Sequence, residues 1–546
     1  MALLSILALG LIFYAPLLIF WKVRASSKSS LNNIPGPKAT SWLKGHMGQL
    51  LHRDAHEFRK DLGEQYGRVV RILGLFSKPQ LFVFDPIALH TILIKEHHIF
   101  EEPPRHRLVG NSIAFGQGLA SVTGDQHKKQ RKLLNPAFSI AHLRQTLPMM
   151  YDVGYRLRDA VSARVDEGNW TEIDMMDWIS RTALELVAQA GLGSSLDSLE
   201  EDTPSPYGEA LKSFVPALVP LALFRRVLPY LVRVGSPGLR RRIVDVIPSA
   251  SLQKVKNIID VLDSNARRIV AEKIDAVRRG DEAGDGKDIL SRLVRANVDT
   301  SGNETMSEEE IVGQVSTLVF AATDTTSSAV ARILFLVAEH QDVQEKLRRE
   351  IVQARNDSQG DLTFDELFEL PYLDAVCRET LRLYPPVSFV TKTARQDTVV
   401  PLSSPLHGVD GHEVDCLHVP RGTTVFVAIA AANRTKEVWG EDAEDWKPER
   451  WLSPIPETLI KARIPGVYSN MMTFLGGGRA CIGFKFSQCE MKVLLSILLE
   501  SFAFELSDTA IQWNTASVQY PSTLTDNKAQ LPIKMKTVQR AKLARQ

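Results

Sequence analysis

The feature that most restricts the fold of this chain is one cysteine surrounded by glycines near the C-terminus. Residues 474–483 read FLGGGRACIG, which places Cys481 where a loop leads into a helix, two residues after Arg479. A thiolate in such a position is stabilised by backbone N–H groups, by the helix N-terminus and by the nearby cation. The pattern is therefore typical of a nucleophilic cysteine or of a metal ligand. The structural alternative is a buried cysteine in a glycine-rich turn.

The other cysteines narrow the choice. The chain has four, at positions 377, 416, 481 and 489, and no Cys-x-x-Cys pair, so the tetrahedral ligand set of zinc is missing around Cys481. So few cysteines also exclude a disulfide scaffold and favour a reducing compartment. Haem takes a single proximal protein ligand, and a cysteine thiolate is one of the groups that serve. The five fixed positions of Phe-x-x-Gly-x-Arg-x-Cys-x-Gly occur by chance on the order of once in ten thousand such chains.

This pattern is similar to the cysteine-loop motif of the cytochrome P-450 family of haem-thiolate monooxygenases, specifically its membrane-anchored eukaryotic, fungal-like members. The motif falls on Phe474, Gly477, Arg479, Cys481 and Gly483 without a mismatch. The resemblance covers the whole chain. It implies a mainly α fold with a small β portion, haem b (iron protoporphyrin IX) as cofactor, and Cys481 as the axial ligand of the haem iron.

The resemblance also implies a structural triad. The family's Glu-x-x-Arg pair falls on Glu379 and Arg382, about 100 residues before the cysteine, and Arg450 in WKPERW matches the third member. A carboxylate bonded to two guanidiniums forms a bidentate network that would lock a helix to the haem-side segment. We expect these three residues to hold the fold and to take no part in the chemistry.

A polar motif interrupts the long apolar segment from residue 308 to 340. Residues 320–326 read FAATDTT, although Thr and Asp disfavour helix interiors because their side chains compete for backbone hydrogen bonds. The motif is similar to the family's oxygen-activating sequence, with Ala322 where glycine is commoner. The resemblance implies that Thr325 holds the reacting oxygen and water by hydrogen bonds and that Asp324 carries protons from solvent. The alternative is a threonine bonded back to the previous turn beside a surface aspartate.

Adjacent residues of a helix point about 100° apart, so Asp324 and Thr325 cannot both face the iron. The prediction is that Thr325 faces the haem and Asp324 faces a water path that leads outward.

Haem propionates require cations, and the resemblance supplies four candidates. Arg479 matches the family. In GDQHKKQRK, His127 stands where the family usually has Trp, and Arg131 follows four residues later on the same side of a helix. Lys392 stands where the family often has an arginine, so the point charge of an ammonium group takes the place of a planar guanidinium fork. The alternative for His127 and Arg131 is a solvated basic face.

The N-terminus predicts a membrane anchor. Residues 2–21 carry no charge, and about 20 apolar residues are what a helix needs to cross the hydrocarbon. Lys22, Arg24 and Lys28 follow, and basic residues stay on the cytoplasmic side. We interpret residues 1–24 as a signal-anchor transmembrane helix, 25–40 as a Pro-rich linker and 41–546 as the haem-thiolate catalytic domain. This organisation predicts a single-pass protein of the endoplasmic reticulum membrane with a cytosolic catalytic domain; a cleaved secretory signal is the alternative.

The rest of the chain predicts one mostly helical body. Residues 69–85 look like two short strands around a turn, helical periodicity dominates from about 86 to 390, and short strands follow. A last helix is expected at 481–501 and strands within 516–536. Strand and helix do not alternate, and no glycine fingerprint follows a strand, which excludes a Rossmann fold. The net charge of +1 argues against nucleic-acid binding.

One further segment suggests contact with a membrane. Residues 211–234 carry no acid, contain three arginines and are interrupted by three prolines, which favours a broken amphipathic element in the headgroup layer. A helix folded against the body is the alternative.

These features together predict a monooxygenase that inserts one oxygen atom from O2 into a lipophilic molecule: a terpenoid, steroid, fatty acid or aromatic compound of secondary metabolism or detoxification. The chain has no flavin or iron–sulfur segment, so electrons would come from a separate NADPH-dependent diflavin reductase. Two alternatives stay open. One is a haem-thiolate isomerase or lyase that acts on peroxides without O2 or reductase, and the other is a non-catalytic haem sensor or electron carrier.

Overall fold

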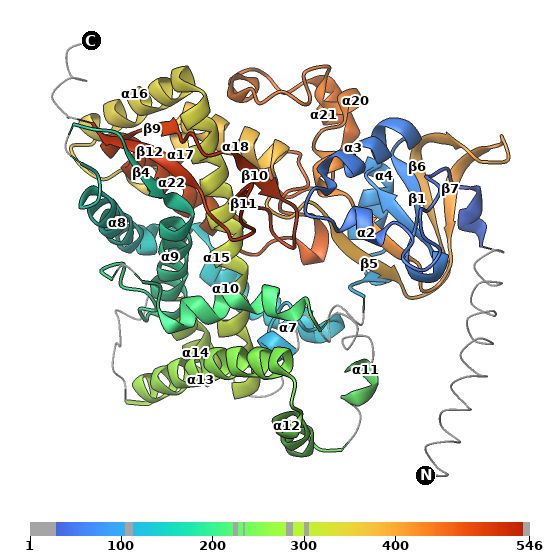
Figure 1. Ribbon diagram of the computed structural model, residues 1–546, viewed down its shortest axis with the longest axis horizontal. Helices are drawn as coiled ribbons and strands as arrows, with labels where there is room; N and C mark the ends of the chain where they lie inside the picture. The colour runs from blue at the N-terminus through green and yellow to red at the C-terminus, as the bar shows by residue number, and fades with distance from the viewer. Residues whose placement is uncertain are drawn as a thin grey trace.

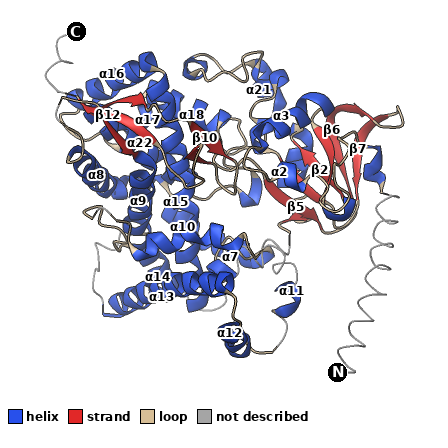
Figure 2. Cartoon of the chain, viewed as in Figure 1, coloured by secondary structure: helices blue, strands red, loops and turns tan. Residues whose placement is uncertain are grey.

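The fold is mainly helical, with four small sheets, in agreement with the predicted class (Figures 1 and 2). The computed structural model describes residues 29–103, 113–166, 168–201, 203–221, 228–232, 235–279, 288–299 and 305–538. The expected anchor at residues 1–24 lies outside these ranges.

The α-helices of the described chain are α2 (Met47–Leu50), α3 (Ala55–Tyr66), α4 (Pro86–His90), α6 (Ile113–Phe115), α7 (Gly124–Leu134), α8 (Ile140–Ser162), α9 (Met175–Val187), α10 (Pro206–Leu218), α11 (Leu228–Leu231), α12 (Pro237–Val246), α13 (Ala250–Arg279), α14 (Ile289–Asp299), α15 (Glu308–Glu339), α16 (Gln341–Asp357), α17 (Phe364–Glu369), α18 (Pro371–Leu383), α19 (Ile429–Ala432), α20 (Lys436–Trp439), α21 (Glu457–Ala462) and α22 (Phe484–Ser501). The strands are β1 (Val69–Leu73), β2 (Pro79–Val83), β3 (Phe100–Glu101), β4 (Thr171–Asp174), β5 (Val390–Ala394), β6 (Thr398–His407), β7 (Glu413–Val419), β8 (Thr424–Val427), β9 (Phe502–Leu506), β10 (Ile511–Asn514), β11 (Tyr520–Thr523) and β12 (Pro532–Thr537).

Helix α15 forms the centre of the helical body and packs against α9, α13, α18 and α22 (Figure 1). Its first turn has a capping box, in which Ser307 and Glu310 satisfy each other's backbone N–H groups. Among the described residues this is the one helix long and apolar enough to cross a membrane, but most of its apolar stretch is buried inside the protein. We therefore interpret α15 as the core helix.

The strands predicted at residues 69–85 are present as the antiparallel pair β1 and β2, in a five-stranded sheet of order β1-β2-β8-β5-β3. Strand β5 pairs with β8 and with β3, so this sheet joins the N-terminal third of the chain to residues 390–427. The other sheets are β4-β12-β9, β6-β7 and β10-β11. The last helix begins at Phe484 rather than at 481, because residues 480–483 belong to the loop that carries the cysteine.

Part of the expected linker packs onto this sheet. Leu31 and Ile34 are buried, and the N–H of Arg71 donates to the carbonyl of Pro35 at 2.8 Å. A Cβ atom at Gly36 would lie 1.9 Å from the carbonyl oxygen of Arg71, so only glycine allows this close approach. Residues 30–37 therefore lie against the body.

The segment 211–234 divides into two parts. Leu211 and Phe214 are buried on α10, which packs against α13, so this part follows the alternative of a helix folded against the body. Val219 and Tyr230 are exposed, by 68% and 71%, and residues 222–227, 233 and 234 lie outside the described ranges. The headgroup-layer interpretation is therefore wrong for α10, because its apolar face is already covered by protein.

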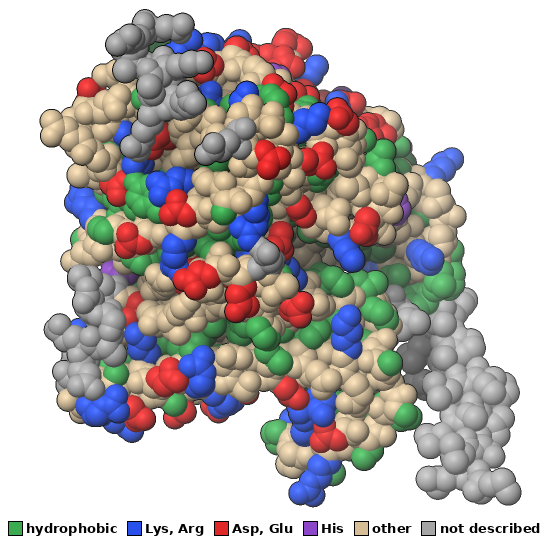
Figure 3. All heavy atoms as spheres, turned by 60° about the vertical axis from the view of Figure 1, so that its left-hand side comes forward, with side chains coloured by type: hydrophobic (Ala, Val, Ile, Leu, Met, Phe, Trp, Pro, Cys, Tyr) green, Lys and Arg blue, Asp and Glu red, His purple; other side chains and the backbone are tan. Residues whose placement is uncertain are grey.

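On the face that Figure 3 shows, basic and acidic side chains are interspersed without a field of one sign. This distribution agrees with the balanced composition.

Candidate active site

Cys481 lies in the loop between a short 3-10 turn, Gly477–Arg479, and the start of α22. The N–H of Cys481 donates to the carbonyl of Phe474 at 2.9 Å, which closes the loop. Gly477 has a φ of +71°, and a Cβ atom there would lie 2.1 Å from the carbonyl oxygen of Leu93, so glycine is required. The glycines of the motif thus let the cysteine loop approach the backbone at residue 93.

The Cys481 thiol is accessible from an internal cavity but is enclosed by protein. Enclosure raises the pKa of this thiol, while the N–H of Gly483 and the guanidinium of Arg131 lower it to a smaller extent. The Arg479 guanidinium donates to the carbonyls of Leu119 and Val122 and lines the same cavity as Cys481. A metal cation at the sulfur would favour the thiolate that the protein groups alone do not.

The Cys481 cavity has a volume of about 190 Å³ and mostly apolar walls. Thr325 and Ala329 line it from α15, Val387 and Val390 line it from the segment after α18, and Phe474 contributes from the cysteine loop. The central helix and the cysteine loop therefore face each other across one space.

The four candidate cations lie together around a second cavity of about 330 Å³, with Arg479 on the walls of both. His127 and Arg131 come from α7 and Lys392 from β5. Burial lowers the pKa of His127 to about 3, helped by Arg479, Arg131 and Lys392, so this imidazole is neutral. Burial also lowers the pKa of Lys392. Grouped cations that lower one another's pKa suit a dianionic group such as the two propionates of haem.

Thr325 lines the Cys481 cavity, while its hydroxyl donates to the carbonyl of Ala321 at 2.7 Å. The back-bonded threonine of the alternative is thus present, but it faces the cavity.

Asp324 is enclosed, which raises the pKa of its carboxyl to about 6, and Lys212 on α10 lowers this pKa to a smaller extent. Lys212 is paired with Asp177 on α9 at 2.7 Å, and both side chains are about one-third exposed. Asp324 is therefore no surface aspartate, and the nearest charge that acts on it belongs to the partly exposed Lys212–Asp177 pair.

An acid that the sequence analysis missed lies next to this pair. The hydroxyl of Thr326 donates to Glu490 on α22 at 3.0 Å, and Glu490 is fully buried with its second carboxyl oxygen lacking a partner among the described residues. Burial raises the pKa of Glu490 well above its usual value, and the hydrogen bond from Thr326 lowers it to a smaller extent. In the sequence, this acid is visible as a glutamate in an apolar helical segment, nine residues after the cysteine.

Glu379 is fully buried and holds several donors at once. Arg382 donates to both of its oxygens, at 2.9 and 2.7 Å, and Arg450 donates at 3.3 Å. The indole of Trp451 and the N–H of Lys447 donate as well, at 2.9 and 3.1 Å. The Glu379 carboxylate thus joins α18 to the segment that precedes the cysteine loop, away from the Cys481 cavity.

Comparison with known proteins agrees with this geometry. Residues 34–530 match the family described as Cytochrome P450. The chain belongs to the cytochrome P450 family. The predicted family membership is thereby confirmed, and with it the class of enzyme: this cytochrome P450 is an oxidoreductase of the monooxygenase type.

Similar proteins come from Postia placenta and Ganoderma lucidum. Cytochrome P450 monooxygenase 91 of Postia placenta is 50% identical to this P450, in an alignment that spans 94% of this chain and 96% of the relative. Cytochrome P450 monooxygenase 219 of the same fungus is 46% identical, in an alignment that spans 98% of this chain and 99% of the relative. The ganoderic acid synthetase CYP5150L8 of Ganoderma lucidum is 42% identical over 95% of this chain and 97% of its own.

The family implies haem, and the described side chains fit it. A thiol opens onto an apolar cavity, and a cluster of cations without a matching number of acids lies directly beside it. The protein must supply a thiolate for the haem iron and cations for the two haem propionates, and both kinds of group are present here.

Proposed function

We propose that this cytochrome P450 inserts one oxygen atom from O2 into a lipophilic small molecule, with electrons from a separate NADPH-dependent diflavin reductase. The observation that carries the proposal is that Thr325 and Cys481 line one apolar cavity while Asp324, beside Thr325, is coupled to the Lys212–Asp177 pair. A haem sensor or electron carrier needs no such proton route.

Cys481 would hold the iron of haem b, and Arg131, His127, Lys392 and Arg479 would hold the propionates. When bound, haem supplies the iron at which O2 is activated, and a thiolate ligand favours cleavage of the O–O bond. Phe474, Gly477 and Gly483 fix the shape of the loop that presents the sulfur. The neutral imidazole of His127 serves as a hydrogen-bond donor, whereas the other three side chains contribute charge.

Asp324 and Thr325 have different roles in proton delivery. The Asp324 carboxyl takes a proton from the solvent side, where Lys212 and Asp177 are one-third exposed, and releases it toward the cavity. The Thr325 hydroxyl, released from the Ala321 carbonyl, positions water in the cavity by hydrogen bonds. Glu490 on α22 accepts the hydrogen bond of the Thr326 hydroxyl and so holds that side chain in place.

The substrate would be apolar, since the cavity walls are formed largely by aliphatic and aromatic side chains. These walls suit a terpenoid, steroid, fatty acid or aromatic compound, and we place the reaction in secondary metabolism or detoxification.

The protein would sit in the endoplasmic reticulum membrane through residues 1–24, with its catalytic domain in the cytosol. The uncharged run at residues 2–21 supports this placement. Helix α12 adds a second element: it exposes Leu239, Ile243 and Val246 beside three consecutive arginines, as amphipathic helices at a lipid surface do.

The test is coexpression with a diflavin reductase, feeding of a library of lipophilic compounds under ¹⁸O2, and mass spectrometry of the products. The proposal predicts products that carry one ¹⁸O atom and that require NADPH, reductase and O2 together. A product formed from a peroxide without O2 or reductase would instead establish an isomerase or lyase.

A further inference from the structure

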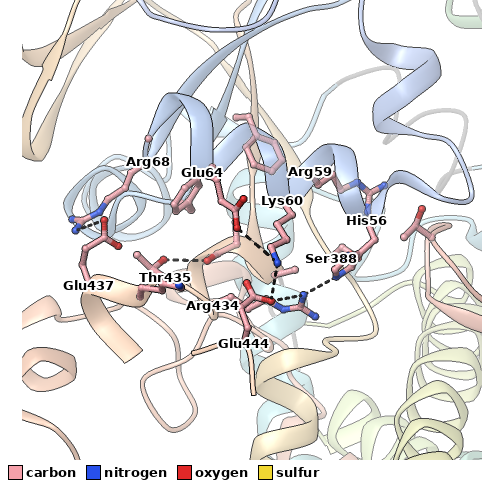
Figure 4. Close-up of a pocket in the computed structure, with 18 of the residues that line it drawn as sticks. His56, Arg59, Lys60, Glu64, Arg68, Ser388, Arg434, Thr435, Glu437 and Glu444 are labelled. Carbon is pink, nitrogen blue, oxygen red and sulfur yellow. Dashed lines mark hydrogen bonds and ion pairs between the residues drawn. The ribbon is translucent and has the colours of Figure 1, made fainter. Parts of the chain in front are cut away.

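A third pocket, of about 380 Å³, lies between α3 and the segment of α19 and α20, apart from the Cys481 cavity and the cation-lined cavity (Figure 4). One side of this pocket, which we call the α3 pocket, is apolar and is formed by Gly63, Phe82, Phe84, Ala430 and Ala431. The other side carries charged groups. A concave site with an apolar body and a polar end is the usual form of a small-molecule site.

The charged side has more cations than acids. Arg434 lies 3.7 Å and Lys60 lies 3.9 Å from the same carboxylate, Glu444, as the converging side chains in Figure 4 show. The imidazole of His56 contacts the Arg434 guanidinium at 2.6 Å. Burial and Arg434 lower the pKa of His56 to about 4, so His56 is neutral and accepts this hydrogen bond. Lys60 also pairs with Glu64 at 3.7 Å, so the excess of positive charge belongs to the whole lining, where five cations (Arg59, Lys60, Arg68, Arg434 and Lys436) face three acids (Glu64, Glu437 and Glu444).

A third cation, Arg332 on α15, lies behind this wall. Its guanidinium is stacked between Trp513, 3.3 Å from the ring centroid, and Tyr384, 4.3 Å from the centroid. Arg434 approaches the same Tyr384 ring at 5.4 Å. Arg332 is only 8% exposed, and within the described ranges it has no hydrogen bond and no ion pair; its Nε is buried without an acceptor.

Such a charge is costly to bury. A buried guanidinium normally has a carboxylate or carbonyl partner, because an uncompensated charge in a low-dielectric interior loses its hydration. Two aromatic faces offset part of this cost through cation–π contact. The electrostatic field of Arg332 adds to that of Arg434 and Lys60 and favours an anion in the α3 pocket.

The α3 pocket shares a wall with the active site. Val387 and Ile429 line the Cys481 cavity, whereas their chain neighbours Ser388 and Ala430 line the α3 pocket. Two adjacent backbone segments therefore have one cavity on each side. Arg332 also lies on the same helix as Thr325, seven residues further on. A molecule in the α3 pocket would thus press on the back of the wall that borders the substrate.

We propose that the α3 pocket binds an amphiphilic carboxylate, with its carboxylate beside Arg434 and Lys60 and its apolar body against Phe82 and Phe84, and that this ligand changes the affinity of the active site. The anion adds negative charge on the side of Arg434, next to a guanidinium whose Nε is buried without an acceptor. The proposal extends beyond the proposed monooxygenase reaction and needs only the folded, haem-loaded protein.

The test is calorimetry on the haem-loaded protein with its active site saturated by a tight azole inhibitor, which prevents binding there. Dodecanoate is the probe, dodecanol its uncharged match and inorganic phosphate the anion without an apolar body. We expect one dodecanoate per protein, no dodecanol binding and at least about tenfold weaker phosphate binding, a tenfold change being about 1.4 kcal/mol. Phosphate bound as tightly as dodecanoate would overturn the assignment of an amphiphilic ligand.

Three variants locate the site. Arg434→Met and Lys60→Glu should each weaken dodecanoate binding about tenfold or more, as expected for loss of a charge-assisted contact. Arg278→Met, at an arginine with a 73% exposed side chain on α13, is the matched control and should leave binding unchanged. Lys60 is partly exposed, so its change tests the site even if Arg434→Met fails to fold. Binding that both variants leave intact, or no dodecanoate binding at all, would refute the site.

Coupling to the active site has its own readout. If dodecanoate changes the dissociation constant of the azole, the azole must change that of dodecanoate by the same factor. Equal dodecanoate affinities with and without azole would refute the coupling but would leave the monooxygenase proposal untouched.

Discussion

Replacing Asp324 by asparagine tests the proton route, because the change keeps the shape of the side chain and removes its titratable carboxyl. Enclosure raises the pKa of Asp324 to about 6. With that pKa, about 90% of the carboxyl is protonated at pH 5 and about 4% at pH 7.4. A wild-type rate limited by proton delivery should therefore fall as the pH rises through 6 toward 8. Loss of a general acid typically costs about 10²–10⁴-fold in rate, which is the decrease expected for Asp324→Asn.

The assay measures NADPH consumed, hydrogen peroxide released and product formed, with reductase and a substrate, between pH 5.5 and 8. Reduction of cytochrome c by the reductase alone corrects for the pH dependence of the reductase. Asp324→Asn should consume NADPH slowly, without the slope centred near pH 6 and with less peroxide per electron. Thr325→Ala should consume NADPH at close to the wild-type rate but release most of the electrons as hydrogen peroxide.

Thr323→Val is the matched control, because Thr323 is a buried threonine of the same helix whose hydroxyl donates to the carbonyl of Val319. It should retain the rate, the pH slope and the coupling of the wild type. An Asp324→Asn variant that keeps the slope would show that another group sets it. Wild-type coupling in Thr325→Ala would refute the role of its hydroxyl and would favour the isomerase.

Three further predictions concern the fold, the buried acid and the topology. Arg382→Met leaves the Glu379 carboxylate buried without its strongest partner. The free energy of unfolding of the haem-loaded protein in urea should therefore fall by about 3–5 kcal/mol, and a decrease below about 1 kcal/mol would contradict the network. Glu490→Gln keeps an oxygen acceptor for the Thr326 hydroxyl, so it should leave the pH profile of turnover unchanged; a displaced profile would show that the Glu490 carboxyl contributes to it. Asn169 and Asn356 are exposed and stand in acceptor sequences for N-glycosylation. A cytosolic catalytic domain should carry no glycan on them, so endoglycosidase treatment should not change the mass of the protein. Glycan on either asparagine would show the opposite orientation.

The sequence predicted the features that depend on local patterns. The strands at 69–85 and the mostly helical body follow from short-range periodicity. The cysteine loop and the Glu379 pair follow from motifs whose residues are close in the chain, and the structure places Glu379 between Arg382 and Arg450. Such features need little knowledge of which distant segments meet.

Features that depend on distant contacts could not be predicted in the same way. Glu490 contacts Thr326 across 164 residues, and its burial depends on the packing of α22 against α15. The direction of the Arg479 guanidinium depends on carbonyls about 360 residues earlier in the chain. Arg332 resembles an ordinary helix arginine in the sequence, and only the fold stacks it between Trp513 and Tyr384.

The most direct test of the haem-thiolate centre is the absorption spectrum of the reduced protein under carbon monoxide. The account predicts the red-shifted Soret band of thiolate ligation, its loss in Cys481→His, and its retention in Cys489→Ala, which changes a buried cysteine eight residues further on. A band that survives in Cys481→His, or one that disappears in Cys489→Ala while haem is retained, would contradict the assignment of Cys481 as the iron ligand.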